Sequence, residues 1–570
     1  MADACQVPRP TQMFPSLGAV FRQALTLLVL SGTVSTQKAP AYDPAPFNYI
    51  GTIDGMTLNT ASGPLGGGTL TVNGFKITIP KNTLVTLPSI TVAWPELFVN
   101  GQPNLPLLGS VSWEATVFGN VVAGQHIAGL VYITQEATQS LTGFITSINF
   151  TTGHFFVDNA VECVLNDPLG RYGHTYTTNP LWSVDPDNPS VRASTGFPIC
   201  IPRNSTDPEC PLTNRPVDTQ GNYLSIFTYP DPARVVAGGL DPRIMAPLAV
   251  GDYIIFSGIK TSEGVLALYS LEANLGIRTA PGTKPAYITV ESANYGIIDP
   301  NPNLETGETR AVALATDATT TVEWFAIDVD PCTGEESERQ LVIAQGSGVA
   351  PVGKIVYRLG KVDASPATRE VGFRYSSGTS PGPRGIVAGQ FIQPIFDFIF
   401  PELITFGANE VPNQFDVIPF LALGSGPLEL GNPLAAPLAS PTIVGQLSPW
   451  PGNPVPAPTS CPPPSAVTST TPTTTPSATP SSPPPAKDII TIVSASSRNQ
   501  KGQTTTTVVA SSNNPAAQLF MAITGVDNVA ATAMTKQANG QFSLAISTKG
   551  KPSSVTVTSS LGGTPVTQAV

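Results

Sequence analysis

The chain has 570 residues, of which 59 are Pro and 51 are Gly, and only 12% are charged. Because Gly and Pro are unfavourable in helix interiors, this composition excludes a long helical protein. The 41% share of hydrophobic residues argues against wholesale disorder. The net charge is −11 and no basic run occurs, so no nucleic-acid partner is expected. What remains is an extracellular, β-rich protein of several domains.

The N-terminal segment has the layout of a secretory signal peptide, which we place at residues 1–36. Arg22 precedes an apolar run at 24–30, and small residues at 33–35 offer a cleavage site. Met13 is a second candidate start. The apolar run is far shorter than the roughly 20 residues of a membrane-spanning helix, and we expect no span elsewhere. The predicted location is therefore extracellular or in the cell wall.

Residues 41–230 are predicted to form the first β domain. In the run 68–80, the pair Asn73-Gly74 lies between alternating strands and favours the two positive φ values of a type I′ hairpin turn. A second hairpin is predicted from the runs 143–150 and 154–158.

The segment 166–216 is Pro-rich and irregular, and loops of this length inside a domain are usually functional or disordered. It contains His174, one of three His in the chain, in a Gly-rich stretch with Asp167 and Arg171 nearby. These three residues are the polar candidates for a catalytic site. The other two His fall in predicted strands, where a structural role is expected.

Five Cys follow the signal peptide. Cys200 and Cys210 bracket a short polar loop, and in an oxidising compartment they form the first disulfide that we expect. Cys163 with Cys332 is the second pairing, which leaves Cys461 free or linked between molecules. No metal site is predicted, because no C-x-x-C pair or paired His completes a ligand set.

Two N-glycosylation sequons occur, at Asn149 and Asn204. Such triplets also arise by chance, so each is a weak signal alone. Asn204 lies inside the predicted disulfide loop, where an exposed acceptor is expected.

Residues 231–440 are predicted to form a second β domain with an apolar, Pro-rich tail from 394 to 438, packed on the domain or exposed as an adhesive patch. Residues 249–258 resemble residues 122–131, since each has a tight Gly turn, an alternating strand and another Gly. The V-G-D-x-I pattern of the later copy is common in small closed β-barrels such as OB-like folds. The predicted modules are therefore OB-like barrels, with β-sandwiches as the alternative.

Residues 441–487 are predicted to be a linker, because 25 of the 31 residues from 455 to 485 are Pro, Ser or Thr. This composition gives an extended stalk and cannot bury a core.

From 488 to 570, short β-branched runs alternate with turn residues, a spacing typical of a small β-sandwich. The opening I-T-I-V-S-A pattern and the ending at 555–563 resemble the Ig-like modules at the C-termini of many secreted fungal and actinobacterial proteins. The resemblance implies an accessory module without catalytic residues.

Four sequence pieces in the Pro-rich segment carry a second resemblance. They are N-D-P-x-G-R-Y-G from Asn166, D-N-P-S-V from Asp187, T-G-F-P-I-C-I-P-R from Thr195 and C-P-x-x-N-R-P from Cys210. Together they resemble a family of large secreted proteins from ascomycete fungi, over much of residues 44–400. The resemblance implies fungal origin and secretion, and it brings no activity and no catalytic residue.

No residue pattern in the chain specifies a reaction. A G-x-S-x-G match at 378–382 is rejected as a nucleophile elbow, because Pro381 has no N–H for an oxyanion hole. The acidic clusters at 185–188 and 328–336 do not match a calcium loop, and no cofactor is predicted.

We therefore expect a secreted protein without its own catalysis, whose partner is a cell-wall glycan, another extracellular protein or a small molecule. The alternative is an extracellular accessory protein or enzyme in fungal secondary-metabolite (polyketide-type) biosynthesis. In that case the segment 166–216 would form the site.

Overall fold

The structure, a computed structural model, describes residues 43–105, 112–299, 301, 303–360, 363–404, 407, 410–428, 442–461, 490–500, 503–512, 517–524, 529–536, 541–548, 552–559 and 566–569. The chain divides into two compact units, Met1–Ser465 and Ala466–Val570. Almost every regular element is a strand, which confirms the predicted all-β class. The predicted signal peptide and residues 462–487 of the predicted linker lie outside the described residues.

Helical segments are short throughout the described chain. They are α1 (Pro419–Ala422) and the 3-10 turns η1 (Thr60–Leu65), η2 (Trp94–Leu97), η3 (Glu136–Thr138), η4 (Pro180–Trp182), η5 (Leu212–Asn214), η6 (Pro232–Arg234), η7 (Pro383–Gly385) and η8 (Phe415–Val417).

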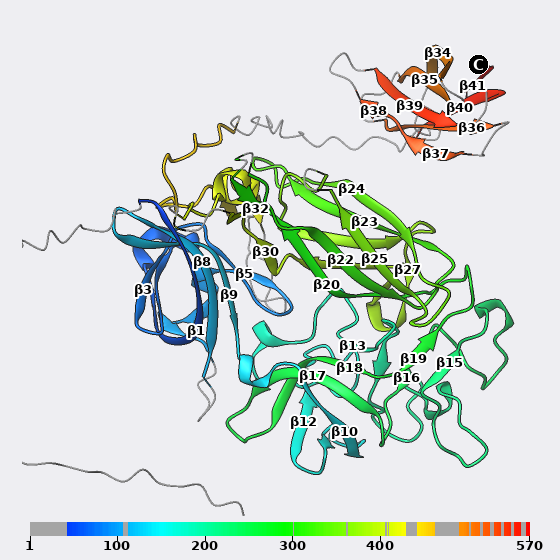
Figure 1. The fold of residues 1–570 in the computed structure, drawn as a ribbon. Coiled ribbons are helices and arrows are strands. Elements are labelled where there is room, and N and C mark those ends of the chain that lie inside the picture. The colour runs from blue at the N-terminus through cyan, green and yellow to red at the C-terminus, as the bar shows by residue number, and fades with distance from the viewer. Residues whose placement is uncertain are drawn as a thin grey trace, which may run out of the picture. The chain divides into compact units, whose positions relative to one another are not determined.

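The first module is a closed five-stranded barrel. Its strands are β1 (Ala45–Leu58), β2 (Gly68–Val72), β3 (Phe75–Ile79), β8 (Glu114–Val122) and β9 (Gln125–Thr134). They pair in the order β3-β2-β1-β8-β9, and a parallel pairing of β3 with β9 closes the ring (Figure 1). A five-stranded Greek-key barrel is the OB-like architecture. The sheet continues past β9 through β4 (Leu84–Thr86) and β5 (Thr91–Ala93), and a small ribbon follows, β6 (Phe98–Val99) with β7 (Gln102–Pro103).

The predicted type I′ turn joins β2 to β3. Asn73 and Gly74 have φ values of 47° and 80°, as this turn requires. The backbone N–H of Gly74 donates to the carboxylate of Asp54 at 2.6 Å, which fixes the turn against β1.

The second module is a barrel of the same topology. Its strands are β10 (Leu141–Ile148), β11 (Phe155–Val157), β12 (Val161–Leu165), β17 (Tyr253–Lys260) and β18 (Leu266–Ala273). They pair in the order β12-β11-β10-β17-β18, closed by parallel pairing of β12 with β18. The predicted second hairpin is β10 with β11. Because β10 pairs with β17, the boundary predicted between 230 and 231 cuts through this barrel and is corrected here.

The boundary was misplaced because a long insertion separates the third and fourth strands and contains the Pro-rich segment. We call this insertion, residues 166–252, the excursion. A short parallel pairing ties it to the barrel, β13 (Val191–Ala193) with β18. Two more order it, β14 (Ile199–Cys200) with β16 (Ala246–Pro247) inside the excursion, and β15 (Ile226–Thr228) with β19 (Gly276–Arg278), which follows β18. The predicted disulfide between Cys200 and Cys210 is present. The segment is therefore an ordered part of the second barrel.

The two barrels share a glycine in their fourth strand, Gly119 in β8 and Gly258 in β17. Each lies where the register against the fifth strand shifts. A Cβ atom on Gly119 would lie 2.3 Å from the carbonyl oxygen of Ile127, and one on Gly258 would lie 2.4 Å from that of Ala267. Both contacts are closer than packed atoms allow, so the strands can approach and bend only with glycine here.

This equivalence corrects the alignment of 122–131 with 249–258. Residues 122–131 contain the start of β9, the fifth strand of its barrel, whereas residues 249–258 contain most of β17, the fourth strand of the other. The duplication is real at the level of topology, but the matched strands differ. The short pattern misleads because both strands follow a glycine turn and contain a glycine.

The third module is an immunoglobulin-like sandwich of two four-stranded sheets. One sheet has the order β25 (Lys354–Leu359), β22 (Thr309–Ala315), β20 (Ile288–Gly296) and β30 (Asp397–Ile399), and the other has β24 (Glu336–Gln345), β23 (Thr321–Val329), β26 (Glu370–Tyr375) and β29 (Gln390–Pro394). Trp324 is fully buried between the sheets and stacks on Phe373 with ring centroids 5.8 Å apart. Short ribbons flank the sandwich, β21 (Leu304–Glu305) with β31 (Glu402–Leu403), and β27 (Ser380–Pro381) with β28 (Val387–Ala388). Both predicted module types thus occur in this unit.

The three modules share their hydrophobic cores. Trp182, from the second module's excursion, packs edge-on against Trp113 of the first at 4.5 Å. Ile386, from the sandwich, lies in the core of the second barrel. The ring of Phe118 in the first barrel packs near that of Phe400, which follows the last strand of the sandwich, with centroids 5.6 Å apart. Each core therefore contains or contacts residues of a neighbouring module, so the modules are packed as one body.

The predicted apolar tail packs on this body where it is described. Phe415, Ile418 and Leu421 are buried in the sandwich core. Asn120 of β8 is fully buried, and its side-chain amide donates to the carbonyls of Asn413 and Pro451. A final ribbon pairs β32 (Gly426–Leu428) with β33 (Thr442–Val444).

The second predicted disulfide is wrong. Cys332 pairs with Cys461, and Cys163 is a free thiol buried in the core of the second barrel. Burial raises the pKa of the Cys163 thiol to about 12, so it stays protonated. The prediction failed because Cys461 lies at the start of a Pro/Ser/Thr tract that looks detached, whereas residues 442–461 still belong to the first unit.

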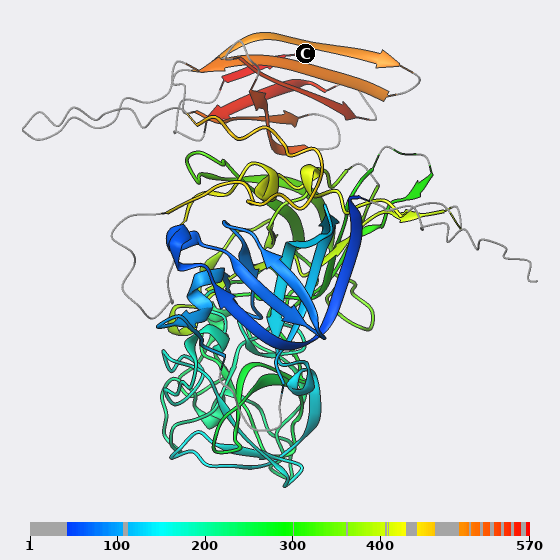
Figure 2. The same ribbon diagram turned by 90° about the vertical axis from the view of Figure 1, so that its left-hand side faces the viewer.

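The C-terminal unit is the predicted Ig-like sandwich. One sheet has the order β34 (Ile490–Gln500), β35 (Gln503–Ser512), β39 (Phe542–Thr548) and β38 (Thr535–Lys536), and the other has β37 (Val529–Ala533), β36 (Leu519–Thr524), β40 (Ser554–Ser559) and β41 (Val566–Ala569). Leu519, Met521 and Val557 lie in its buried core. Figure 2 shows the two layers of strands in orange and red.

Among the residues that the structure describes, no helix has the length and apolar character to cross a membrane.

We predict that Gly119→Ala and Gly258→Ala each lower the free energy of unfolding by about 1–3 kcal/mol, because the added methyl group forces the fourth and fifth strands apart. Gly55→Ala is the matched control in β1, since a Cβ there meets no atom within 4 Å. Chemical denaturation of the full chain measures the three changes. An equal loss in all three variants would contradict the assignment.

We predict that peptide mapping without reduction finds Cys332 linked to Cys461, and that Cys163 reacts with iodoacetamide only after denaturation. Cys461→Ser should lower stability by about 2–4 kcal/mol, because the disulfide closes a loop across 129 residues. A Cys163 peptide that is disulfide-linked or labelled in the native protein would contradict the pairing.

Candidate functional site

A cleft of about 570 Å³ lies where the three modules of the first unit meet. The first barrel contributes Thr134 from β9, the second contributes Ser257 and Tyr269 from β17 and β18, and the sandwich side contributes Phe391 and Phe396. Its size is in the range of small-molecule sites. Because all three modules line it, the site forms only when they are packed together.

One wall of the cleft is lined by hydroxyl groups. Thr134, Ser257, Tyr269 and Ser270 all reach it. The Tyr269 side chain is 4% exposed, and its hydroxyl lies beside the hydroxyls of Thr134 and Ser257. Burial raises the pKa of Tyr269 to about 12, although the Thr134 and Ser257 hydroxyls lie close enough to lower it. The hydroxyls that line the cleft can donate to and accept from a bound oxygen atom.

The lining of the cleft is also aromatic. Phe118 and Tyr132 of the first barrel and Phe391 and Phe396 near the sandwich line it. The rings of Tyr132 and Phe396 lie 6.4 Å apart, and the Tyr132 hydroxyl donates to the carbonyl of Ile395 at 3.3 Å. Burial, followed by the charge of Asp397, raises the pKa of Tyr132, so this phenol is also neutral. The wall therefore offers flat apolar surface to a ring.

A hydrogen-bonded loop holds the second barrel to the sandwich at the edge of the cleft. The Asn188 amide donates to the carbonyl of Ile392 at 2.5 Å and accepts from the Ile392 N–H at 2.9 Å. The Asp185 carboxylate orients this amide by accepting from it at 2.8 Å. Burial raises the pKa of Asp185 to about 6 despite these hydrogen bonds.

The cleft has little positive charge to offer. Arg192 is the cation that lines it, and it is paired with Glu272. Asp185 and the exposed Asp397 add two carboxylates. An anionic ligand is therefore disfavoured, whereas a neutral ring with hydroxyl or carbonyl groups matches the hydroxyl and aromatic groups of the lining.

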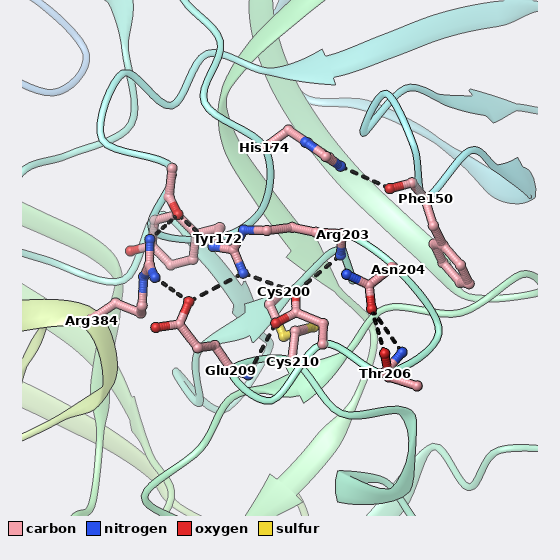
Figure 3. Close-up of polar contacts among 12 residues, drawn as sticks. Phe150, Tyr172, His174, Cys200, Arg203, Asn204, Thr206, Glu209, Cys210 and Arg384 are labelled. Carbon is pink, nitrogen blue, oxygen red and sulfur yellow. Dashed lines mark hydrogen bonds and ion pairs between the residues drawn. A yellow bond between two sulfur atoms is a disulfide. The ribbon is translucent and has the colours of Figure 1, made fainter.

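Two of the three predicted catalytic candidates, Asp167 and Arg171, interact with each other, and all three have structural partners. Asp167 is buried and accepts from the backbone N–H of Tyr172 at 2.7 Å. Arg171 donates to the carbonyl of Pro186. His174 shares a hydrogen bond with the carbonyl of Phe150 at 2.8 Å, as Figure 3 shows. They hold the Pro-rich segment in shape and do not line the cleft.

An ion network beside them joins the second barrel to the sandwich. The carbonyl of Gly170 accepts from Arg203 and from Arg384, each at 2.7 Å. Glu209 lies between the two guanidinium groups and pairs with both (Figure 3). Hydrogen bonding to Arg384 is the main reason that the pKa of Glu209 is lowered. The Cys200–Cys210 disulfide closes the loop that carries this network.

Both sequon asparagines are exposed. The Asn204 side-chain oxygen accepts from the N–H and the hydroxyl of Thr206, at 2.9 and 3.0 Å. The Asn149 oxygen accepts from the N–H of Thr151 at 2.9 Å. Both acceptor residues are accessible, and glycosylation of either stays a prediction.

The sequence did not point to the cleft, because its residues come from three modules and form no local motif. Comparison of the sequence with protein-family models gave no match, and comparison with curated proteins gave none either. Within the described part of the chain, no group of three or more His, Cys, Asp or Glu residues is placed to hold a metal ion.

We predict a pH signature of Asp185 in the stability of the protein. Its folded-state pKa of about 6 exceeds the ordinary value of 3.8, so the folded state binds the proton more tightly than the unfolded state. Protonated Asp185 therefore contributes up to about 3 kcal/mol to the free energy of unfolding. This contribution is full below about pH 4 and is lost as the pH rises through 6.

Denaturation of the native protein and of Asp185→Asn between pH 4 and 7 isolates this effect, because the other acids cancel in the difference. The stability of the native protein relative to the variant should fall with rising pH. A difference that is flat or increases would contradict the assignment.

Proposed function

We propose that this protein is a secreted, non-catalytic binding protein that holds a neutral, ring-bearing ligand in the cleft between its three modules. The observation that carries the proposal is the lining of the cleft, which combines the hydroxyls of Thr134, Ser257 and Ser270 with the rings of Phe391 and Phe396. Hydroxyl groups can donate to and accept from a ligand oxygen, and aromatic rings offer a flat apolar surface to a ligand ring.

The residues around the cleft support binding more than catalysis. Tyr132 and Tyr269 are held protonated by burial. None of the three His lines the cleft. A general base needs a pKa near the working pH and access to the substrate proton. Of the carboxylates there, only Asp185 has a pKa raised toward that range, and its oxygens are occupied by the Asn188 loop.

The extracellular location is part of the proposal. Two disulfides and an apolar N-terminal run are compatible with export. In an extracellular setting the ligand is a wall component or a small secreted metabolite. The rival role as an enzyme in secondary-metabolite assembly rested on Asp167, Arg171 and His174, whose side chains have structural partners.

We expect the neutral fluorophore N-phenyl-1-naphthylamine to bind the full chain at one site with increased emission. Ser270→Trp, which fills the cleft, should weaken this binding at least tenfold. Ile255→Trp is the matched control, because Ile255 is exposed on β17 and does not line the cleft. Fluorescence titration measures both variants, and circular dichroism checks their folding.

Equal affinity in Ser270→Trp and the native protein would overturn the proposal. So would equal loss in both tryptophan variants, because the effect would then not come from the cleft. Tyr269→Phe is a second control. It should leave the affinity for the fluorophore unchanged, since this probe has no oxygen to accept a hydrogen bond.

A further inference from the structure

We propose a second binding site, on the first barrel, that takes a neutral saccharide chain by stacking a sugar ring on Phe75. The site is a stack of three aromatic rings, Phe47 and Tyr49 from β1 and Phe75 from β3, with His126 of β9 beside them. We call these four residues the aromatic shelf.

The rings of the aromatic shelf lie nearly parallel. The Phe47 and Tyr49 centroids are 4.6 Å apart with planes at 28°, and those of Tyr49 and Phe75 are 4.3 Å apart at 24°. Phe47 is 7% exposed and anchors one end in the barrel core, while Phe75 is 47% exposed at the other. The outer ring thus presents aromatic surface to solvent on a fixed base.

Two features hold the aromatic shelf in place, the space left by a glycine and a hydrogen bond to the middle ring. Gly119 leaves room for the Phe47 ring, since a Cβ there would lie 2.3 Å from it. The Tyr49 hydroxyl and His126 Nε2 are hydrogen-bonded at 2.9 Å, which fixes the middle ring. A preformed shelf binds with little loss of side-chain entropy.

Closure of the barrel does not require this stack. The second barrel has the same topology, yet its third strand begins with Val161 where the first barrel has Phe75. An aliphatic residue therefore suffices at that place in the fold. The aromatic residues of the first barrel need another explanation, and a stack whose outer ring is exposed is suited to pack against the face of a ligand ring.

The charges next to the shelf select the ligand. Each of the two turns next to the shelf binds a carboxylate, since Asp54 of β1 accepts from the Gly74 N–H at 2.6 Å and Asp43 accepts from the Ala123 N–H at 2.9 Å. Lys76 is the neighbouring exposed cation on β3, so with the two carboxylates the surface has no net positive charge for the phosphates of a nucleic acid. A neutral pyranose with equatorial hydroxyls has a flat face of C–H groups that matches the negative face of an aromatic ring.

The test uses the full chain with cellohexaose and chitohexaose in isothermal titration calorimetry. At least one should bind the native protein, and Phe75→Leu should weaken it at least tenfold while Phe75→Trp keeps it. Leucine preserves apolar bulk and tryptophan preserves the flat ring, so the pair separates stacking from folding. Phe144→Ala is the matched control, since Phe144 is a 53% exposed phenylalanine on the second barrel.

No binding of either saccharide at millimolar concentration would overturn the proposal, and so would equal affinity of Phe75→Leu and the native protein. Tighter binding of oligo-dT than of the saccharides would assign the shelf to nucleic acid instead. Ser270→Trp, which blocks the cleft, should leave saccharide binding unchanged. The shelf and the cleft can therefore fail independently.

Discussion

Apolar packing across module boundaries is the constraint on which the rest of the first unit depends. Trp182 of the second module packs on Trp113 of the first, and Ile386 of the sandwich lies inside the second barrel's core. Separating the modules would expose these buried side chains to water, at roughly 2 kcal/mol for each large one. Inter-domain contacts are often polar and mobile, but these are continuous with the cores. The cleft therefore has fixed walls, although no single module forms it.

Polar groups then set the register of that packing. The Asn188 amide pairs with both backbone groups of Ile392, and Glu209 bridges Arg203 and Arg384. Such directional contacts add less free energy than the apolar burial, but they distinguish one docking geometry from its neighbours. The Pro-rich segment supplies most of these groups. Its unusual length is explained by the joint that it builds between the second barrel and the sandwich.

Local patterns in the sequence predicted local structure well. The Asn73-Gly74 turn, the Cys200–Cys210 loop and the C-terminal sandwich each depend on neighbouring residues, and all are present. The failures involve distance along the chain. Cys461 reaches Cys332 across 129 residues, and the second barrel is completed only after the long excursion that ends before β17. The cleft was missed for the same reason, because a surface assembled from three modules leaves no motif in any one of them.

The scarcity of charge is consistent with recognition of neutral ligands. Arg215 is buried and donates two hydrogen bonds to the carboxylate of Asp252. Glutamates at or near the module junctions pair with three more arginines, Arg203, Arg384 and Arg192. A guanidinium fixed in this way is not available to bind a phosphate or a carboxylate without leaving its partner exposed or unpaired. Aromatic faces remain at both proposed sites, and hydroxyl groups remain at the cleft. These groups recognise rings and oxygen atoms without a net charge.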